Sequence, residues 1–323
     1  MVHLPSPLQT CQRFALALFI LTGGTLVSHA KPRDSTSITR LQIYLDNHDF
    51  GPGPIDGQYG KFTQRALAYY NAQKSQPKGE WKIPLALAER EVPIVFVTHR
   101  ITKADIGWIG RVPNDLRAQA VQRGLPYTSL IEFLCERYHT DGHFLQRLNP
   151  RVDLEHLKPG DLVIVPNVRH VFRIEAVPVS KRYKKESDKS SCYILIDTTQ
   201  KMASIYRGTQ MLAAFPITHG RPQFVPKGRW KIQSMVTTPT FRWDERMLKE
   251  GQRSEHYYLL PPGPNNPVGI LWAGINKKGI GLHGTNSPEK IGRTHSAGCI
   301  RFCNWDAIRL PSFIRPGSEV IVR

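Results

Sequence analysis

Long hydrophobic runs are scarce in this sequence, and their scarcity limits how the chain can meet a membrane. One apolar run, residues 14–21, follows Arg13, and small residues stand at 28–30. The run is too short to span a bilayer comfortably, so we predict that residues 1–30 are a signal peptide cut after Ala30. An uncleaved N-terminal anchor is the alternative. No other segment is apolar enough to cross a membrane, so no stable span is expected after cleavage.

Acidic residues are also scarce, with 26 Asp and Glu against 44 Lys and Arg. The formal net charge is +18, and removal of the signal takes away only the charge of Arg13. A basic surface on an exported protein favours an anionic partner, such as the carboxylates of a cell envelope. Nucleic acid is the generic alternative. It is disfavoured because the sequence has no recognition motif and no aromatic stacking pattern, and because the export signal opposes it.

Cysteine is the third shortage, with five residues in a chain of 323. Cys11 lies in the predicted signal, which leaves Cys135, Cys192, Cys299 and Cys303. If Cys299 stays a free thiol, three remain, and an odd number argues against a framework of disulfides. A chain of this length is therefore expected to depend on buried cores, in two or three domains.

The most informative residues lie near the C-terminus, where Cys299 follows sixteen residues after His283. The apolar run before His283 predicts a short strand, and Gly284 allows a sharp turn after it. A cysteine thiolate is a strong nucleophile, and a nearby histidine can accept its proton or pair with it as an ion. Gly298 lets the backbone approach a substrate, and N–H groups around residues 298–300 could bind an oxyanion.

Two other interpretations of these residues compete with catalysis. In the first, Cys299 is a small buried apolar residue and His283 a satisfied histidine, as most such pairs are. In the second, Cys299, Cys303, His283 and His295 bind zinc. The zinc interpretation is weaker because the two cysteines lack the usual Cys-x-x-Cys spacing.

The motif closely resembles that of the YkuD-type L,D-transpeptidase family, in which His-Gly is followed by Ser-x-Gly-Cys-Ile-Arg. Further segments that resemble the family are Phe215–Gly220, Val225–Ile232, Pro261–Gly269 and Arg315–Val322. The resemblance covers about residues 191–323. One departure is Ala297, where many members have His or Arg.

The resemblance implies a role for each matching residue. Cys299 is expected to be the nucleophile and His283 the base, with Gly298 and Gly284 supplying the backbone of the oxyanion site. Residues expected to contact the substrate are Arg301, Ser296, Asn304 and Trp272. No metal or organic cofactor is expected. The roles of His219 and His295 are left open.

The predicted fold is a multi-domain α+β chain with a mostly β catalytic domain at residues 191–323. Segments 193–197, 202–206 and 212–217 read as strands at the spacing of a meander. A helix is expected to begin near residue 304. The family's known sandwich-like β fold agrees with this pattern.

Two small units are predicted before the catalytic domain. Residues 36–76 resemble a helical peptidoglycan-binding domain, with Asp56 as a structural residue of its loop. Residues 126–168 resemble a LysM glycan-binding module, although its usual first strand is weak or missing. Residues 77–125 are read as a connector without assigned function, and residues 169–190 as a charged linker.

The predicted function is an exported L,D-transpeptidase of the periplasm or cell wall. Its substrate would be the peptidoglycan stem tetrapeptide, joined through a Cys299 thioester into 3→3 crosslinks with release of D-alanine. An L,D-carboxypeptidase or crosslink hydrolase that uses water is the first alternative, because only the acceptor differs. Attachment of an envelope protein and a non-catalytic wall-binding protein are the others.

Overall fold

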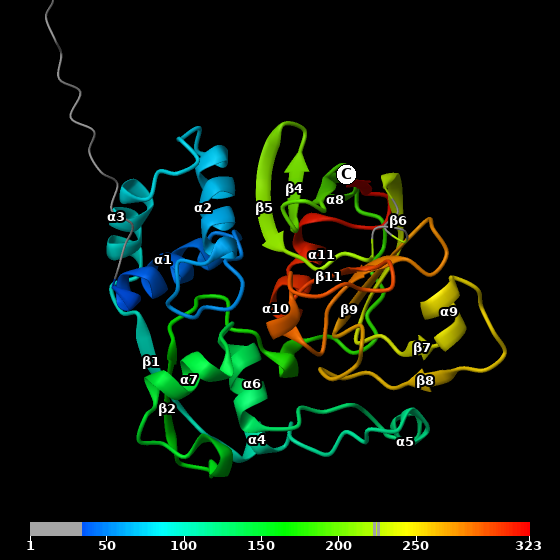
Figure 1. The fold of residues 1–323 in the computed structure, drawn as a ribbon, viewed down its shortest axis with the longest axis horizontal. Coiled ribbons are helices and arrows are strands. Elements are labelled where there is room, and N and C mark those ends of the chain that lie inside the picture. The colour runs from blue at the N-terminus through cyan, green and yellow to red at the C-terminus, as the bar shows by residue number, and fades with distance from the viewer. Residues whose placement is uncertain (1–33, 222–223, 225–226) are drawn as a thin grey trace, which may run out of the picture. The chain divides into compact units, whose positions relative to one another are not determined.

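The computed structural model describes residues 34–221, 224 and 227–323 (Figure 1). The predicted signal peptide, residues 1–30, lies outside these residues. In the described part of the chain, no helix is both long enough and apolar enough for a bilayer crossing.

The N-terminal region consists of three helices, α1 (Ser35–Asn47), α2 (Lys61–Gln73) and α3 (Lys82–Glu91). Helix α1 begins after Asp34, whose carboxylate accepts the N–H groups of Thr36 and Ser37. It buries Leu41, Tyr44 and neighbouring residues with the expected helical spacing. Because α3 lies beyond residue 76, the helical region is longer than the predicted unit at 36–76.

The loop between α1 and α2 is organised by hydrogen bonds around Asp56. Its Oδ1 accepts the Gln58 N–H at 2.8 Å and the Gln42 side-chain amide at 2.8 Å. The Gln42 carbonyl in turn accepts the N–H groups of Asp56 and Gly57. Asp56 thus holds the turn, as its position in the sequence predicts.

A second region is built on a two-stranded antiparallel sheet of β1 (Phe96–Arg100) and β2 (Leu162–Pro166). The helices between these strands are α4 (Lys103–Ile106), α5 (Leu116–Ala120), α6 (Leu130–Arg137) and α7 (Gly142–Leu148). Strand β1 thus lies inside the segment read as a connector, whereas its partner β2 lies inside the segment predicted to be LysM-like. About thirty residues separate β1 from α6, which is why a local pattern did not reveal it.

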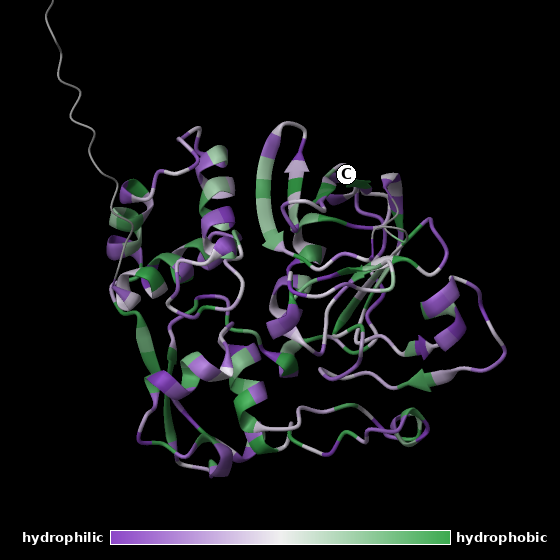
Figure 2. Ribbon diagram, in the orientation of Figure 1, coloured by the Kyte–Doolittle hydropathy of each residue, from purple (hydrophilic) through white to green (hydrophobic). Residues whose placement is uncertain are grey.

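The C-terminal region contains a sheet of eight strands in the order β11-β10-β9-β6-β12-β3-β4-β5. Its strands are β3 (Tyr193–Asp197), β4 (Met202–Arg207), β5 (Gln210–Pro216), β6 (Gly228–Thr237), β9 (Leu271–Ile275), β10 (Gly281–His283), β11 (Ile300–Arg301) and β12 (Glu319–Val322). The pairs β10–β11 and β12–β3 are parallel, and the other neighbours are antiparallel. Figure 2 shows apolar residues along the strands of this sheet.

Further elements surround this sheet. A hairpin of β7 (Phe241–Trp243) and β8 (Tyr258–Leu260) encloses helix α9 (Glu245–Glu250), which is largely hydrophilic in Figure 2. The other helices are α8 (Ser187–Ser190), α10 (Asn304–Ala307) and α11 (Leu310–Phe313).

The strands predicted at 193–197, 202–206 and 212–217 correspond to β3, β4 and β5, and the helix expected near 304 is α10. In β3, the buried side chains of Ile194 and Ile196 alternate with half-buried ones, which explains why the alternating pattern was readable. The segment read as a charged linker is less free than predicted. Its Arg182 forms a bridge to Val236 of β6, so part of it extends the sheet.

A buried charge cluster joins the N-terminal helical region to the C-terminal region. Arg309 donates to the carboxylate of Asp46 at 3.0 and 3.2 Å, and His139 lies 3.0 Å from the same carboxylate. The His139 ring stacks on Trp305 with ring centroids 5.4 Å apart. Burial alone would raise the pKa of Asp46, but Arg309 and His139 outweigh it and hold that pKa well below its usual range.

We predict that Asp46→Asn lowers the free energy of unfolding by about 3 kcal/mol, because it leaves the buried Arg309 charge without its main partner. Asp153→Asn, which breaks an exposed contact with His156, is the matched control and should cost under about 1 kcal/mol. Since the pKa of Asp46 is depressed, its contribution is present above the unfolded carboxyl pKa of about 3.9 and is lost as pH falls below it. Urea unfolding at pH 7 and pH 3 measures both effects, and equal losses in the two variants would contradict the prediction.

Candidate active site

His283 ends strand β10, where its ring is almost completely buried, with 3% of its surface exposed. Its Nδ1 lies 2.6 Å from the carbonyl oxygen of Gly284. A carbonyl can only accept, so Nδ1 carries the proton and Nε2 is left as an acceptor. Trp272 of β9 lies opposite His283 in the antiparallel pair, and its ring stacks on the imidazole with centroids 5.7 Å apart. This contact covers one face of the imidazole.

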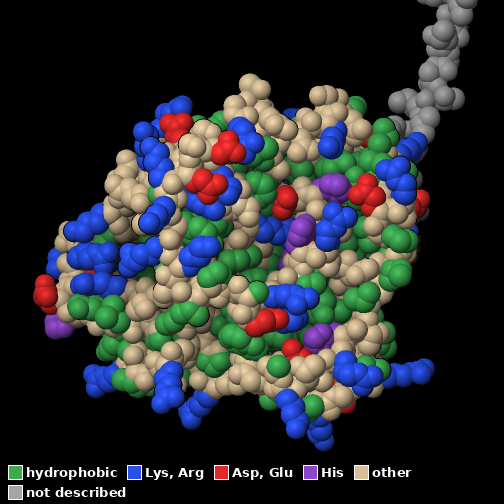
Figure 3. Space-filling model, turned by 180° about the vertical axis from the view of Figure 1, so that it is seen from behind, with side chains coloured by type: hydrophobic (Ala, Val, Ile, Leu, Met, Phe, Trp, Pro, Cys, Tyr) green, Lys and Arg blue, Asp and Glu red, His purple; other side chains and the backbone are tan. Residues whose placement is uncertain are grey.

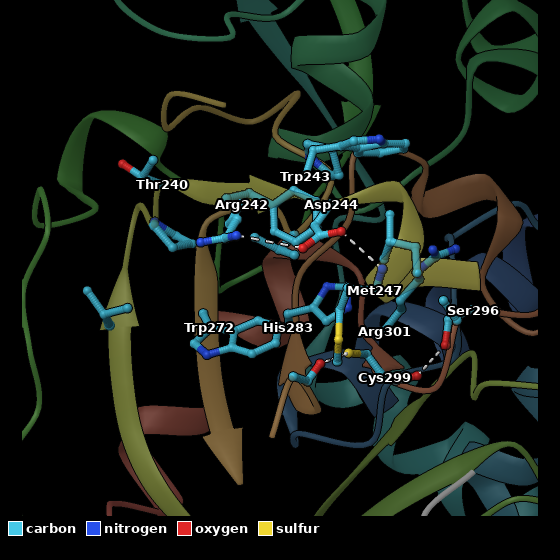
Figure 4. A pocket seen from close by; sticks show the side chains of 18 of the residues that line it. Thr240, Arg242, Trp243, Asp244, Met247, Trp272, His283, Ser296, Cys299 and Arg301 are labelled. Carbon is cyan, nitrogen blue, oxygen red and sulfur yellow. Dashed lines mark hydrogen bonds and ion pairs between the residues drawn. The ribbon is translucent and has the colours of Figure 1, made fainter. Parts of the chain in front are cut away.

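Cys299 immediately precedes β11, which runs parallel to β10 with Leu282 opposite Ile300. This register brings Cys299 beside the strand that carries His283. The Cys299 sulfur lies 3.6 Å from the carbonyl oxygen of Gly279. In Figure 4 the imidazole of His283 and the sulfur of Cys299 occupy the same cavity.

Ser296 shapes the turn before the cysteine. Its hydroxyl accepts the Gly298 N–H at 3.1 Å and donates to the Cys299 carbonyl at 2.5 Å. Gly298 has a φ of +124°, and its Cα lies only 2.4 Å from where a side chain on Gly220 would begin. Both glycines are therefore needed for this close approach. Ser296 lines the cavity, but its hydroxyl is used in holding the turn.

The hydrogen bonds change the expected oxyanion site. The N–H of Gly298 is taken by Ser296, and that of Gly284 donates to the Leu271 carbonyl at 3.2 Å. The N–H of Cys299, in contrast, has no acceptor among the residues that the structure describes. The available backbone donor is thus that of Cys299, because the N–H of Gly298 is used in the turn and that of Gly284 within the sheet.

Asn304 does not line the cavity, contrary to its predicted contact with substrate. It is fully buried at the start of α10, and its Oδ1 accepts the N–H groups of Ile270 and Thr285 at 3.2 and 3.1 Å. A side chain at Gly284 would begin 2.1 Å from this oxygen, which explains the glycine there. A residue with no exposed surface has no contact to offer a bound substrate, so Asn304 serves the architecture of the turn.

Arg301, on β11 opposite His283, is the charge that both catalytic candidates sense. Burial, with a contribution from Arg301, lowers the pKa of His283 to about 3. Burial raises the pKa of Cys299 to about 11, although the Gly281 N–H and Arg301 oppose this. At neutral pH the resting pair is therefore a neutral imidazole and a neutral thiol, and of the two expected arrangements this favours proton transfer over a preformed ion pair.

The cavity around this pair has a volume of about 530 Å³, and most of its charged lining residues are arginines among apolar and neutral ones. Its charged lining residues are Arg182, Arg242, Arg253, Arg301 and Asp244. Asp244 caps helix α9, where its carboxylate accepts the N–H groups of Met247 and Ser254, and Arg242 lies 3.8 Å from it. The methyl end of Met247 packs against Gly279 beside the cysteine (Figure 4). Such a cavity suits a ligand with several carboxylates.

Sequence reasoning missed the cationic residues of this cavity other than Arg301. Arg182 comes from the segment read as a linker, whereas Arg242 and Arg253 come from the β7–β8 hairpin region. None of them stands in a motif, because their convergence depends on how the hairpin folds over the sheet. No local signal could have identified them.

Two histidines and one cysteine near the site lie apart from the pair. The rings of His219 and His295 meet edge to face with centroids 5.5 Å apart, and neither ring lines the main cavity. Cys303 is buried at the start of α10. No group of three or more His, Cys, Asp or Glu side chains within the described residues is placed to bind a metal ion.

A thiol and an imidazole share this cavity, beside a backbone N–H that has no acceptor among the described residues. Known proteins resemble this part of the chain. Residues 191–322 match the family model of the L,D-transpeptidase catalytic domain, YkuD. Residues 191–322 are thus similar to an L,D-transpeptidase catalytic domain, in agreement with the resemblance that the motif indicated.

Two individual proteins and one solved structure are similar to parts of this chain. The relative named L,D-transpeptidase YkuD from Bacillus licheniformis is 23% identical over 192 residues, which cover 59% of this chain and 92% of that protein. Its namesake from Bacillus subtilis is 42% identical over 78 residues, which cover 24% of this chain and 48% of that protein. A crystal structure of an Enterococcus faecium L,D-transpeptidase aligns with a TM-score of 0.32 and 19% identity, over 41% of this chain and 50% of that one. The last two alignments span only about half of the related protein.

We predict that Arg301→Gln slows alkylation of Cys299 by iodoacetamide about tenfold at pH 9. Removal of the positive charge raises the thiol pKa, and a nearby charge commonly shifts such a pKa by about one. Mass spectrometry of the peptide that contains Cys299 measures the rate. Arg253→Gln is the control, because Arg253 lines the same cavity but does not contribute to the pKa shift of the thiol. This variant should react like the wild type. Identical rates for Arg301→Gln and wild type would show that Arg301 does not lower the pKa of the Cys299 thiol.

Proposed function

We propose that this protein is an exported L,D-transpeptidase that crosslinks peptidoglycan stem peptides through a thioester on Cys299. The observation that carries the proposal is the Cys299 and His283 pair, neutral and sharing a cavity with four arginines in the part of the chain that matches the L,D-transpeptidase catalytic domain. The other interpretations of these residues, a structural cysteine or a zinc site, account less well for the fixed imidazole and for a Cys299 N–H that has no acceptor among the described residues.

In the first half-reaction, the Cys299 sulfur attacks the carbonyl that links the third residue of a tetrapeptide stem to its terminal D-alanine. Nε2 of His283 takes the thiol proton, since Nδ1 is held by the Gly284 carbonyl. The Cys299 N–H binds the oxyanion that forms on the attacked carbonyl. The carbon–nitrogen bond then breaks, the amine of D-alanine receives the proton from His283, and a thioester remains.

In the second half-reaction, an amine of a neighbouring stem attacks the thioester. His283 accepts a proton from this amine and returns it to the Cys299 sulfur as the thioester bond breaks. The product is a 3→3 crosslink, and the thiol is regenerated. If water attacks instead, the same pair gives an L,D-carboxypeptidase or a crosslink hydrolase.

The charge of the protein supports an anionic polymer as substrate. Stem peptides carry free carboxylates, and the cavity offers Arg182, Arg242 and Arg253 beside the reacting pair. Lys and Arg side chains also outnumber Asp and Glu on the face seen in Figure 3. The helical region and the region of β1 and β2 are proposed to bind the wall as peptidoglycan-binding-like and LysM-like units. An export signal at residues 1–30 is part of the same proposal.

We expect the full chain to convert a disaccharide-tetrapeptide into a crosslinked dimer and free D-alanine, as read by mass spectrometry. Cys299→Ala should abolish both products, and His283→Ala should reduce them by about a hundredfold or more. Ser180→Ala, at the rim of the cavity, serves as a folding control. Tripeptide and D-alanine without dimer would shift the assignment to the carboxypeptidase, and absence of any cysteine-dependent product would refute catalysis on this substrate.

We also expect activity to persist in acid. Because the pKa of His283 is lowered to about 3, the imidazole stays neutral and able to accept a proton down to about pH 4. The profile of kcat/KM against pH, corrected for unfolding by circular dichroism at each pH, measures this. An acid limb near the ordinary histidine pKa of about 6.5 would show instead that the base is more exposed in the working enzyme.

A further inference from the structure

We propose that Glu136, on helix α6 of the N-terminal half, is a positioning residue for the catalytic base. It fixes the side-chain amide of Asn304, which in turn fixes the backbone around His283. The proposal rests on the proposed function of His283. It assigns the N-terminal half a part in catalysis besides any contact with the wall.

Asn304 contacts the turn that follows His283. Oδ1 of Asn304 accepts the Thr285 N–H at 3.1 Å and the Ile270 N–H at 3.2 Å. Ile270 directly precedes β9, and Thr285 lies two residues after His283. One oxygen atom therefore ties together the ends of the two paired strands β9 and β10 at the catalytic base.

This turn holds the imidazole of His283 in place. The carbonyl of Gly284, which accepts a hydrogen bond from Nδ1–H of His283, lies between His283 and Thr285 in the chain. If Thr285 loses its anchor, this carbonyl moves, and with it the tautomer and the direction of Nε2. An error of about 1 Å at a catalytic group can lower the rate about a hundredfold.

Glu136 sets the orientation of the Asn304 side-chain amide. A side-chain amide can bind either way round, and only one way presents its oxygen to two N–H donors. Nδ2 of Asn304 donates to Oε1 of Glu136 at 2.8 Å, and both side chains are buried. Glu136 thus supplies the acceptor that decides the orientation. Its other oxygen accepts the Tyr127 hydroxyl at 2.6 Å, which holds the carboxyl group itself in place.

Glu136 is a costly residue to keep at this position. Its hydrogen-bond partners are Tyr127 and Asn304, and no cation among the described residues pairs with it. Burial raises its pKa to about 8, although both hydrogen bonds oppose this. Oε1 can accept from Asn304 whether the carboxyl group is charged or neutral. The function that we infer therefore depends on an acceptor, and a neutral amide of the same shape should replace it.

The test compares Glu136→Gln with Glu136→Met in the full chain. Gln keeps an acceptor for Asn304 and can donate to Tyr127, so it should retain at least about half of kcat. Met keeps the length but offers no acceptor, so kcat should fall about tenfold or more while KM changes less than about twofold. In the NMR spectrum, the downfield Nδ1–H signal of His283 should persist in wild type and Gln and shift or broaden in Met.

Glu132→Met is the matched control on the same helix, since among the described residues the Glu132 carboxylate accepts from Thr128 and has no hydrogen bond with Asn304. It should lose stability without losing kcat or the His283 signal. Equal kcat and an unchanged signal in Glu136→Met would overturn the proposal, as would equal losses in the Gln and Met variants. If Glu136→Met does not fold, Glu136→Asp, whose shorter side chain withdraws from Asn304, takes its place.

Failure of the proposed function is separable from failure of this inference. If wild-type protein gives no cysteine-dependent product, the proposed function fails. The Nδ1–H signal of His283 then still reports whether Glu136 positions the imidazole, because it requires no substrate.

Discussion

The candidate site depends on the pairing of β10 with both β9 and β11. The antiparallel pair sets Trp272 against His283, and the parallel pair brings Cys299 alongside the same strand. These short ladders hold the proposed base on a strand and the proposed nucleophile directly before one, and a loop could not hold them as firmly. The glycines around them permit the close backbone contacts that the ladders need.

Burial decides the chemistry of the pair. It disfavours the charged forms of both the imidazole and the thiol, and Arg301 only partly offsets this for the thiol. The pair therefore rests uncharged at neutral pH. In the proposed reaction it transfers a proton as attack occurs, and the arginines of the cavity bind the carboxylates of the ligand.

The N-terminal and C-terminal regions meet through buried polar groups. Asp46 and Arg309 form one such contact, and Glu136 and Asn304 form another. Buried polar groups of this kind require well-defined partners, because an unpaired one is expensive. They give the junction a specific geometry that apolar packing alone would leave less defined.

The sequence by itself determined the resemblance of residues 191–323 to a known family, the first strands of this region and the candidate pair of Cys299 and His283. These features depend on local patterns: alternating burial in β3, glycines beside the catalytic residues, and a motif within about twenty residues. The tertiary structure decided what depends on distant contacts. It placed Asn304 in the core, used the Gly284 N–H within the sheet, supplied the first strand of the second region from β1, and brought Arg182 and Arg242 to the cavity. Hydrogen-bond partners and burial are set by residues far apart in the chain, so no local pattern could contain them.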